Sequence, residues 1–285
     1  MKYLSAAVIS LWASVAFAQA PPSGAPSLFF TCGSPDKIEA AAKAQLSNSS
    51  APDVDLAAAQ KAVALGKAQQ EKALDGQAVD DAFKSASRFG ALAKTASDPE
   101  IADLYYRVAR DQLHRGIFTA AERKASWATG LSDVALAYAF QILSGEGCGV
   151  DADNTHWLKA RIASRGWFKI STSGVEADRA AFVLTQHADR DPEFQGQVLE
   201  ILEPLVAAGE TKPSNFAYLF DRVAIANNRP QRYGTQGLCS AMGWKPVVGI
   251  EDVDGLDKRR SAVGLPPHQD YVKRCAPPAA PKQAP

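Results

Sequence analysis

The sequence lacks most of the motifs by which enzymes are identified. It has no H-E-x-x-H zinc motif, no G-x-S-x-G nucleophile motif and no phosphate-binding P-loop. The glycines of "GEGCGV" (145–150) follow a predicted helix rather than a strand, so they do not indicate a dinucleotide site. The histidines are His114, His156, His187 and His268, and their spacing matches no metal site. We therefore predict no metal and no cofactor.

The chain also lacks an excess of charge of either sign. Its 31 Lys and Arg residues balance 31 Asp and Glu residues. Nucleic acids and anionic membrane surfaces both attract basic faces, so this balance argues against either as a partner. No apolar run reaches the ~20 residues that cross a bilayer, so we expect no membrane span once the N-terminal segment is removed.

The N-terminal segment has the pattern of a signal peptide. Lys2 is followed by a short apolar run from Leu4 to Phe17, and A-F-A and A-Q-A at 16–20 fit the small-x-small cleavage rule. No cysteine stands at the cleavage point, so a lipoprotein anchor is not indicated. The alternative is a retained membrane anchor. We expect residues 1–20 to be removed, and a soluble bacterial protein that is periplasmic or secreted.

Cysteines are few, and none forms a C-x-x-C pair. Zinc binding and thiol redox chemistry are therefore not indicated. In an oxidising compartment, Cys32, Cys148, Cys239 and Cys275 predict two disulfides. Three pairings are possible, and we favour Cys239 with Cys275, which leaves Cys32 with Cys148.

Helical patterns account for most of the chain. Ala, Gln, Lys and Glu dominate residues 36–95, and all four are strong helix formers. Asp98 followed by proline, and Ser132 further on, are helix N-cap signals. "NTHWLKARIASRG" predicts a helix from Asn154 to Gly166. Near the C-terminus, "RYGTQGLC" and "WKPVVGI" predict a pair of strands. The predicted fold is mainly α, a helical bundle or array with one small β-hairpin near the C-terminus.

Composition divides the chain into five parts. We predict a signal peptide (1–20), a leader (21–35), an Ala-rich helical N-terminal region (36–150), a helical domain with a polar loop and the hairpin (151–275), and a disordered tail (276–285). One stretch, residues 135–166, loosely resembles a single Sel1-type repeat, but a helical repeat array needs several copies.

The most unusual stretch is the polar loop "NNRPQRYGTQGLC" (227–239), which follows a strongly apolar helix. Gln231, Tyr233, Thr235 and Gln236 supply donors and acceptors that suit a neutral polar ligand. Gly234 permits a positive φ or a close approach of a ligand. Two interpretations stay open, because the same groups could instead form a hydrogen-bonded brace for the hairpin.

Three other residues are candidates for a site in the same region. Asp221 and Arg222 lie on a helix that is apolar on two sides, so both need partners. They either anchor the loop or belong to a site. His187 lies on an apolar helix face at a predicted C-terminus, where it either bonds the last carbonyls or acts as an acid or base oriented by Asp189 or Asp221.

Several ordered motifs carry a resemblance to a known family. "QHADRDPEFQ", "NFAYLFDRV", "RPQRYGTQ" and "VDGLDKRRSAVGLPP" resemble an uncharacterised bacterial family with a Q-x-Y-G-T-Q signature, domain of unknown function 6624, over about residues 150–273. The resemblance implies no reaction. It implies these signature positions: Trp167, His187, Asp189, Gln195, Asp221, Arg222, Gln231, Tyr233, Gly234, Thr235, Gln236 and Arg260.

Two functions follow as hypotheses. In the first, an exported protein binds or acts on a polar substrate of the cell envelope or the extracellular space. His187 and Asp221 would be catalytic in that case, and Arg222 with the loop residues would bind the substrate. In the second, the chain is a non-enzymatic helical interaction module, similar to Sel1 or tetratricopeptide proteins, that docks an envelope protein in the periplasm.

Overall fold

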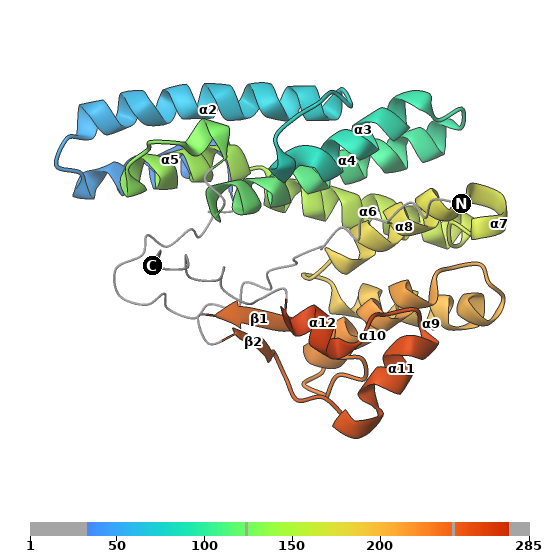
Figure 1. The fold of residues 1–285 in the computed structure, drawn as a ribbon. Coiled ribbons are helices and arrows are strands. Elements are labelled where there is room, and N and C mark those ends of the chain that lie inside the picture. Colours follow the sequence, from blue (N-terminus) through green and yellow to red (C-terminus); the bar gives the residue numbers. More distant parts are fainter. Residues whose placement is uncertain (1–32, 123–124, 241–242, 274–285) are drawn as a thin grey trace, which may run out of the picture. The chain divides into compact units, whose positions relative to one another are not determined.

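The computed structural model describes residues 33–122, 125–240 and 243–273. The chain divides into two compact units, Met1–Trp157 and Leu158–Pro285. The boundary between the units falls inside one helix, α6 (Gly147–Arg165). The described elements are helices and one two-stranded antiparallel sheet near the C-terminus (Figure 1), so the predicted fold class is confirmed. In the described ranges, no helix combines the length and the apolar character that crossing a membrane requires.

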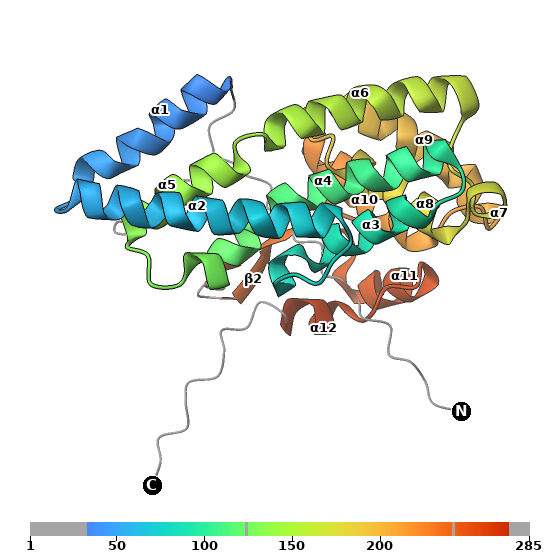
Figure 2. The ribbon, with the colours of Figure 1, turned by 90° about the horizontal axis from the view of Figure 1, so that it is seen from above.

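The first unit is built from long helices joined by short turns. They are α1 (Pro35–Gln45), α2 (Pro52–Leu74), α3 (Lys84–Thr95), α4 (Pro99–Glu122), α5 (Asp133–Ser144) and the start of α6, with 3₁₀ turns at Leu46–Asn48, Asp81–Phe83 and Ser126–Ala128. Helix α5 packs against both α1 and α2, and α3 packs along α4 (Figure 2).

The N-cap signals predicted for this unit are confirmed. Asp98 accepts hydrogen bonds from the backbone N–H groups of Glu100 and Ile101 at 2.8 and 3.0 Å. Ser132 accepts from the backbone N–H of Ala135 at 3.2 Å. These bonds satisfy N–H groups that have no partner inside the helix.

The predicted start of α6 at Asn154 is wrong, because this helix begins at Gly147. Burial of Val150 explains the extra turns, since packing outweighs the low helix propensity of the glycines at 147 and 149. The predicted end is close, and Gly166 takes a left-handed φ of 72° directly after Arg165.

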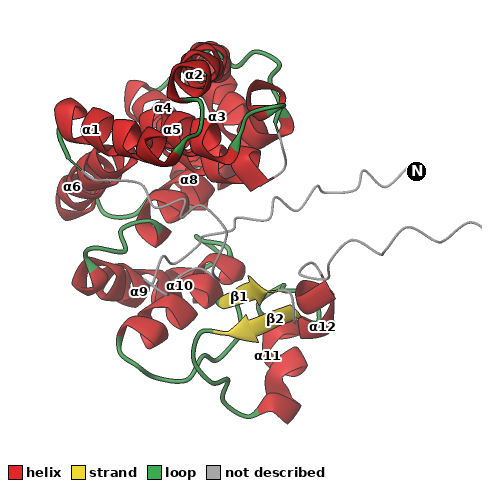
Figure 3. Ribbon diagram, turned by 90° about the vertical axis from the view of Figure 1, so that its left-hand side faces the viewer, coloured by secondary structure: helices red, strands yellow, loops and turns green. Residues whose placement is uncertain are grey.

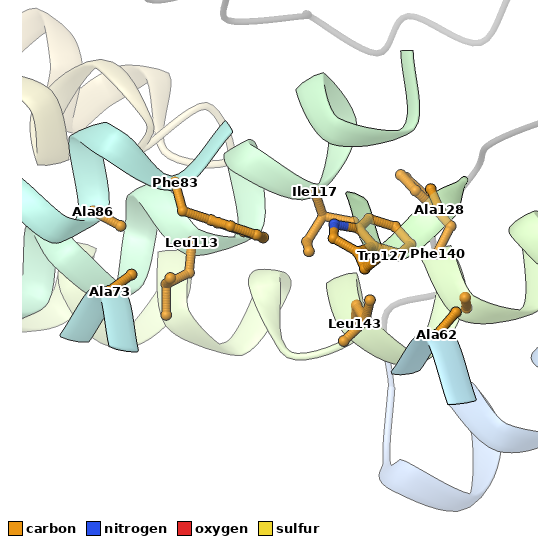
Figure 4. Packing of buried hydrophobic residues seen from close by; sticks show 11 residues of the cluster. Ala62, Ala73, Phe83, Ala86, Leu113, Ile117, Trp127, Ala128, Phe140 and Leu143 are labelled. Atoms are coloured by element: carbon orange, nitrogen blue, oxygen red, sulfur yellow. The ribbon is translucent and has the colours of Figure 1, made fainter. Parts of the chain in front are cut away.

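The core of the first unit takes its bulk from α4, α5 and the short turns. The cluster in Figure 4 contains Ala62, Ala73, Phe83, Ala86, Leu113, Ile117, Trp127, Ala128, Ala139, Phe140 and Leu143. The buried members that α2 contributes are alanines, and its half-buried Val63 and Leu74 pack against the cluster. At Gly66, a Cβ atom would lie 2.5 Å from a methyl group of Leu143, so small residues on α2 allow α5 to approach closely.

The second unit begins within α6 and adds shorter elements. They are α7 (Ile170–Ser173), α8 (Val175–Gln186), α9 (Pro192–Ala207), α10 (Pro213–Ala226), β1 (Gly237–Ser240), β2 (Gly243–Pro246), a 3₁₀ turn (Val253–Gly255), α11 (Leu256–Ala262) and α12 (His268–Val272). Helix α10 packs against α8 and α9. Figure 3 shows the two strands near α11 and α12.

The hairpin is shorter than the sequence predicts. Strand β1 starts at Gly237, which pairs with Pro246 of β2. Arg232 to Gln236 were expected to belong to the strand, and that expectation is wrong. Backbone N–H groups in this stretch are bonded to side chains instead of to a neighbouring strand, as described next.

Candidate functional site

Asp221 is a fully buried carboxylate on α10 that holds the loop before β1. Its Oδ1 accepts hydrogen bonds from the backbone N–H groups of Arg232 and Tyr233 at 2.7 and 3.0 Å. Its Oδ2 accepts from the backbone N–H and the hydroxyl of Thr235 at 2.8 and 2.9 Å. Burial raises the pKa of Asp221, and the four donors oppose that rise. Asp221 therefore fixes the conformation of residues 232–235.

Gln231 fixes the same loop from its other end. Its side-chain oxygen accepts from the backbone N–H of Gln236 at 2.8 Å, and its amide nitrogen donates to the Gln236 and Val248 carbonyls at 2.8 and 3.3 Å. The Gln231 backbone also pairs with Gly249 and Glu251. Residues 231–236, hereafter the signature loop, are thus tied both to α10 and to the segment after β2.

The remaining predicted loop residues are also buried. Gln236 donates through its side-chain nitrogen to the Thr235 hydroxyl at 3.1 Å. The ring of Tyr233 packs edge-on against Phe220 of α10, with ring centres 6.0 Å apart. Tyr233, Thr235 and Gln236 are each less than a tenth exposed. The polar groups of the signature loop are therefore directed mainly into the protein.

Arg222, the neighbour of Asp221, belongs to a different group of side chains. One helix position turns a side chain by about 100°, so adjacent residues face different sides. Arg222 donates through Nη1 to Asp189 Oδ1 at 2.6 Å. Only 6% of the Arg222 side chain is exposed, against 46% for Asp189. A buried guanidinium therefore supports a carboxylate that reaches the surface.

Gln195 of α9 completes this polar cluster and joins it to the end of α8. Its side-chain nitrogen lies 3.2 Å from Asp189 Oδ1 and 3.2 and 3.3 Å from the carbonyls of Thr185 and Gln186. These carbonyls belong to the last turn of α8, where helix carbonyls need partners. Arg222, Asp189 and Gln195 are called the Arg222 cluster below.

His187 caps the C-terminus of α8, as the sequence predicts, and it is buried. Its Nε2 lies 3.2 Å from the side-chain nitrogen of Gln186. The Gln186 carbonyl accepts from Gln195, so His187 adjoins the Arg222 cluster through the α8 terminus. The predicted constellation thus falls into two groups, one around Asp221 with the signature loop and one around Arg222 with His187 nearby.

Sequence reasoning missed a second buried carboxylate, Asp178 of α8. It accepts hydrogen bonds from Trp167 Nε1 at 2.8 Å, Thr211 Oγ1 at 2.6 Å, Lys212 N at 3.2 Å and Asn215 Nδ2 at 2.9 Å. It joins α8 to the segment before it and to the start of α10. An acidic residue in the first turns of a helix is usually exposed to solvent, so the local sequence does not predict that Asp178 is buried. The only other signal was the presence of the donors Trp167 and Asn215, which are distant in the sequence.

The comparisons with known proteins place both groups of side chains inside one family match. A family model described as a family of unknown function, DUF6624, matches residues 130–277, which is more than half of the chain. The chain belongs to this family. The DUF6624 match includes α8, α10, the signature loop and α11, and thus both groups of site residues. No curated protein and no solved structure matches the chain.

Two of the four cysteines predicted to form disulfides lie where the structure describes the chain. Cys32 and Cys275 lie outside the described residues. Cys148 lies in α6 and Cys239 in β1. The pairings Cys32–Cys148 and Cys239–Cys275 stay predictions.

Proposed function

We propose that this DUF6624 protein is exported and binds a polar ligand at the Arg222 cluster of its C-terminal unit. One observation carries the proposal. The buried Arg222 holds the half-exposed Asp189 at 2.6 Å, so a charged pair is fixed at the surface by a rigid interior. Ion pairs between two exposed side chains contribute little to stability, and this pair is different because one partner is immobilised.

The chemistry of the cluster favours a ligand with an anionic or carbonyl group beside a donor group. Such a ligand can accept from the Arg222 guanidinium, whose planar fork suits carboxylate and carbonyl oxygens. Asp189 then accepts from the donor group of the ligand. His187, next to the cluster, would be the acid or base if the bound ligand is also turned over. Asp221 acts as a positioning residue, because both its oxygens hold the signature loop.

Export to the periplasm or the medium is part of the proposal, and the signal-peptide pattern of residues 1–20 supports it. These residues lie outside the described part of the chain. A polar substrate of the envelope or the extracellular space fits both the compartment and the charged pair. Fractionation of a bacterium that expresses the full chain, with an antibody against it, would place the protein.

The binding test uses residues 21–285 and a panel of cell-wall fragments and short peptides, with affinities measured by calorimetry. A compound that binds the wild type should bind Arg222→Met at least about tenfold more weakly, since a charged hydrogen bond contributes about 1.5–3 kcal/mol. Arg229→Met, an exposed site in the same unit, is the matched control. Equal affinity for a folded Arg222→Met would show that the ligand binds elsewhere.

A second function, the helical interaction module, is favoured by a recess in the first unit. A cavity of about 330 Å³ lies between α1, α2 and α5. Its lining includes the apolar residues Ile38, Val63 and Ile142 and the charged residues Lys67 and Glu146. That volume lies within the range of ligand and anchor-residue pockets.

If the recess holds a side chain of an envelope protein, Ile142→Arg should abolish capture of that partner from a periplasmic extract. The half-buried Ile142 lines the recess, and a charged side chain would fill it. Val253→Arg, on an exposed residue of the second unit, is the control and should leave capture intact. Capture of the same partner by both variants would exclude the recess as the docking site.

A further inference from the structure

Arg260 carries a buried charge whose described close contacts are all neutral: two backbone carbonyls and the Tyr271 ring. Arg260 is 0% exposed. Its Nε donates to the carbonyl of Pro266 at 2.7 Å and its Nη1 to the carbonyl of Tyr233 at 2.6 Å. Among the described residues, Nη2 has no hydrogen-bond partner and no carboxylate lies within ion-pair distance of the guanidinium. Fully buried arginines are nearly always paired, because an uncompensated buried charge is costly.

His268 presents a second unused donor. Within the described ranges, the Nε2 atom of His268 is buried and makes no hydrogen bond of good geometry, although the backbone of Gly234 lies close enough to the ring to raise its pKa. The imidazole lies edge-on to Trp244, with ring centres 4.8 Å apart, and the backbone N–H of His268 donates to Asp257 at 2.7 Å. Burial lowers the pKa of His268 and the neighbouring Arg260 lowers it further, against the smaller opposing effects of Asp257 and the Gly234 backbone. The ring is therefore neutral at pH 7 and can carry its single proton on Nε2.

Both of these groups contact the signature loop. Arg260 bonds the Tyr233 carbonyl, and Tyr271 donates from its hydroxyl to the Thr235 carbonyl at 2.8 Å. Between them, Gly234 has a φ of 59°, and a Cβ there would lie 3.2 Å from Nε2 of His268. Three consecutive loop residues thus meet Arg260, His268 and Tyr271 in order.

Aromatic rings join these three side chains into one wall. The Tyr271 ring centre is 5.5 Å from the Arg260 guanidinium carbon and 6.0 Å from the Trp244 ring centre. Trp244 in turn contacts His268. Arg260 and His268 are therefore linked through Tyr271 and Trp244 into one group of contacting side chains from α11, α12 and β2, beside the signature loop.

We propose that Arg260 Nη2 and His268 Nε2 bind a carboxylate group behind the signature loop. A carboxylate is planar, and its two oxygens can accept from two separate donors. Its single negative charge matches the one guanidinium, whereas a phosphate dianion would leave an unbalanced buried charge. The nearby acids do not fill this role. Asp221 is bonded to the loop, and Asp257 accepts from the His268 backbone.

This site is separate from the Arg222 cluster and independent of the proposed function. A carboxylate bound there would contact a wall that also holds the Tyr233 and Thr235 carbonyls. Ligand binding should therefore stabilise the signature loop and the short helices α11 and α12 together, as expected for a ligand that binds only the folded state.

The test is a thermal-unfolding titration of residues 21–285 with sodium acetate, against sodium chloride at equal ionic strength. Acetate should raise the melting temperature of the wild type in a saturable way, and chloride should not. His268→Phe keeps a ring beside Trp244 but removes Nε2. The apparent acetate affinity of this variant should fall at least about tenfold, because one charge-assisted hydrogen bond is lost. His156→Phe, at an exposed histidine, should respond as the wild type does.

A measurement on the unmodified chain covers the case in which His268→Phe does not fold. Acetate should shift the NMR signals of the Arg260 guanidinium and the His268 ring with one common affinity. An equal thermal shift by chloride would show an adventitious ion only and would overturn the proposal. So would a full acetate response in folded His268→Phe, the absence of any acetate response, or tighter binding of inorganic phosphate.

Discussion

Replacement of Asp221 by alanine is expected to lower the free energy of unfolding of the C-terminal unit by about 3–5 kcal/mol, as in other cases where one partner of a buried charged network is removed. The variant leaves three backbone N–H groups and the Thr235 hydroxyl without their acceptor. Each unsatisfied buried group costs about 1–3 kcal/mol, and partial entry of water reduces the sum. Urea unfolding followed by circular dichroism measures the loss.

The matched control is Asp254→Ala, at an exposed carboxylate in the same unit. Surface substitutions of this kind change stability by about 0.5 kcal/mol or less. Gln231→Ala should lower the free energy of unfolding by an amount between those of the two other variants. It removes a neutral side chain that bonds only backbone groups of the loop and of residue 248. Equal unfolding midpoints for Asp221→Ala and Asp254→Ala would refute the bracing role.

This result would decide between the two interpretations of the signature loop. A ligand-binding loop keeps donors and acceptors available, and its substitution commonly costs little stability or even adds some. A brace uses its polar groups internally. The bonds from Asp221 and Gln231 to backbone groups favour the brace. Ligand binding is then left to the Arg222 cluster and to the buried Arg260 and His268 donors.

The sequence allows the helices to be predicted well because their signals are local. Asp98 and Asp191 each stand one residue before a proline and accept backbone N–H groups two or three positions ahead. The error at α6 has a different origin. Gly147 is a poor helix former, and it is helical because the surroundings of Val150 bury that turn. Packing of this kind leaves no local signal.

The sequence predicts which residues are candidates for the site, but it does not predict which of them contact one another. Burial of Asp221 and Arg222 follows from the two apolar faces of α10, and their adjacency suggested one shared site. In the fold, Asp221 meets residues 11 to 14 positions ahead, whereas Arg222 meets Asp189, which lies 33 positions back. The Asp178 contacts span up to 37 positions. Such pairings depend on how the helices pack, and they cannot be recognised from local patterns in a single sequence.

The second large effect is expected from His114 of α4 and concerns the stability of the first unit at acid pH. Burial lowers the pKa of His114 from 6.5 to about 4, against the opposing effect of Asp111. At pH 7 the ring is neutral in both the folded and the unfolded state. As the pH falls below 6.5, the unfolded chain takes up a proton that the folded chain does not accept until about pH 4. The free energy of unfolding therefore decreases as the pH falls from 6.5 to about 4, by about 3 kcal/mol in total.

His114→Gln should remove this part of the acid sensitivity. The free energy of unfolding, measured by urea at a series of pH values from 7 to 4, should fall less steeply for the variant than for the wild type. His156→Gln, at an exposed histidine, should keep the wild-type slope. Identical slopes for wild type and His114→Gln would mean that His114 is protonated as readily in the fold as in the unfolded chain.

The contacts around His114 explain why burial outweighs the nearby acid. Asp111 is already paired with Arg115 at 2.9 Å and accepts from Gln112 at 2.8 Å, so its charge is largely compensated. Within the described residues, Nδ1 of His114 is buried and has no hydrogen-bond partner. Gly147 packs against the ring, and a Cβ there would lie 3.4 Å from its Cγ. A proton added to this ring would lose most of its hydration, and Asp111 and Glu146 would compensate only part of that loss, which is the physical origin of the lowered pKa.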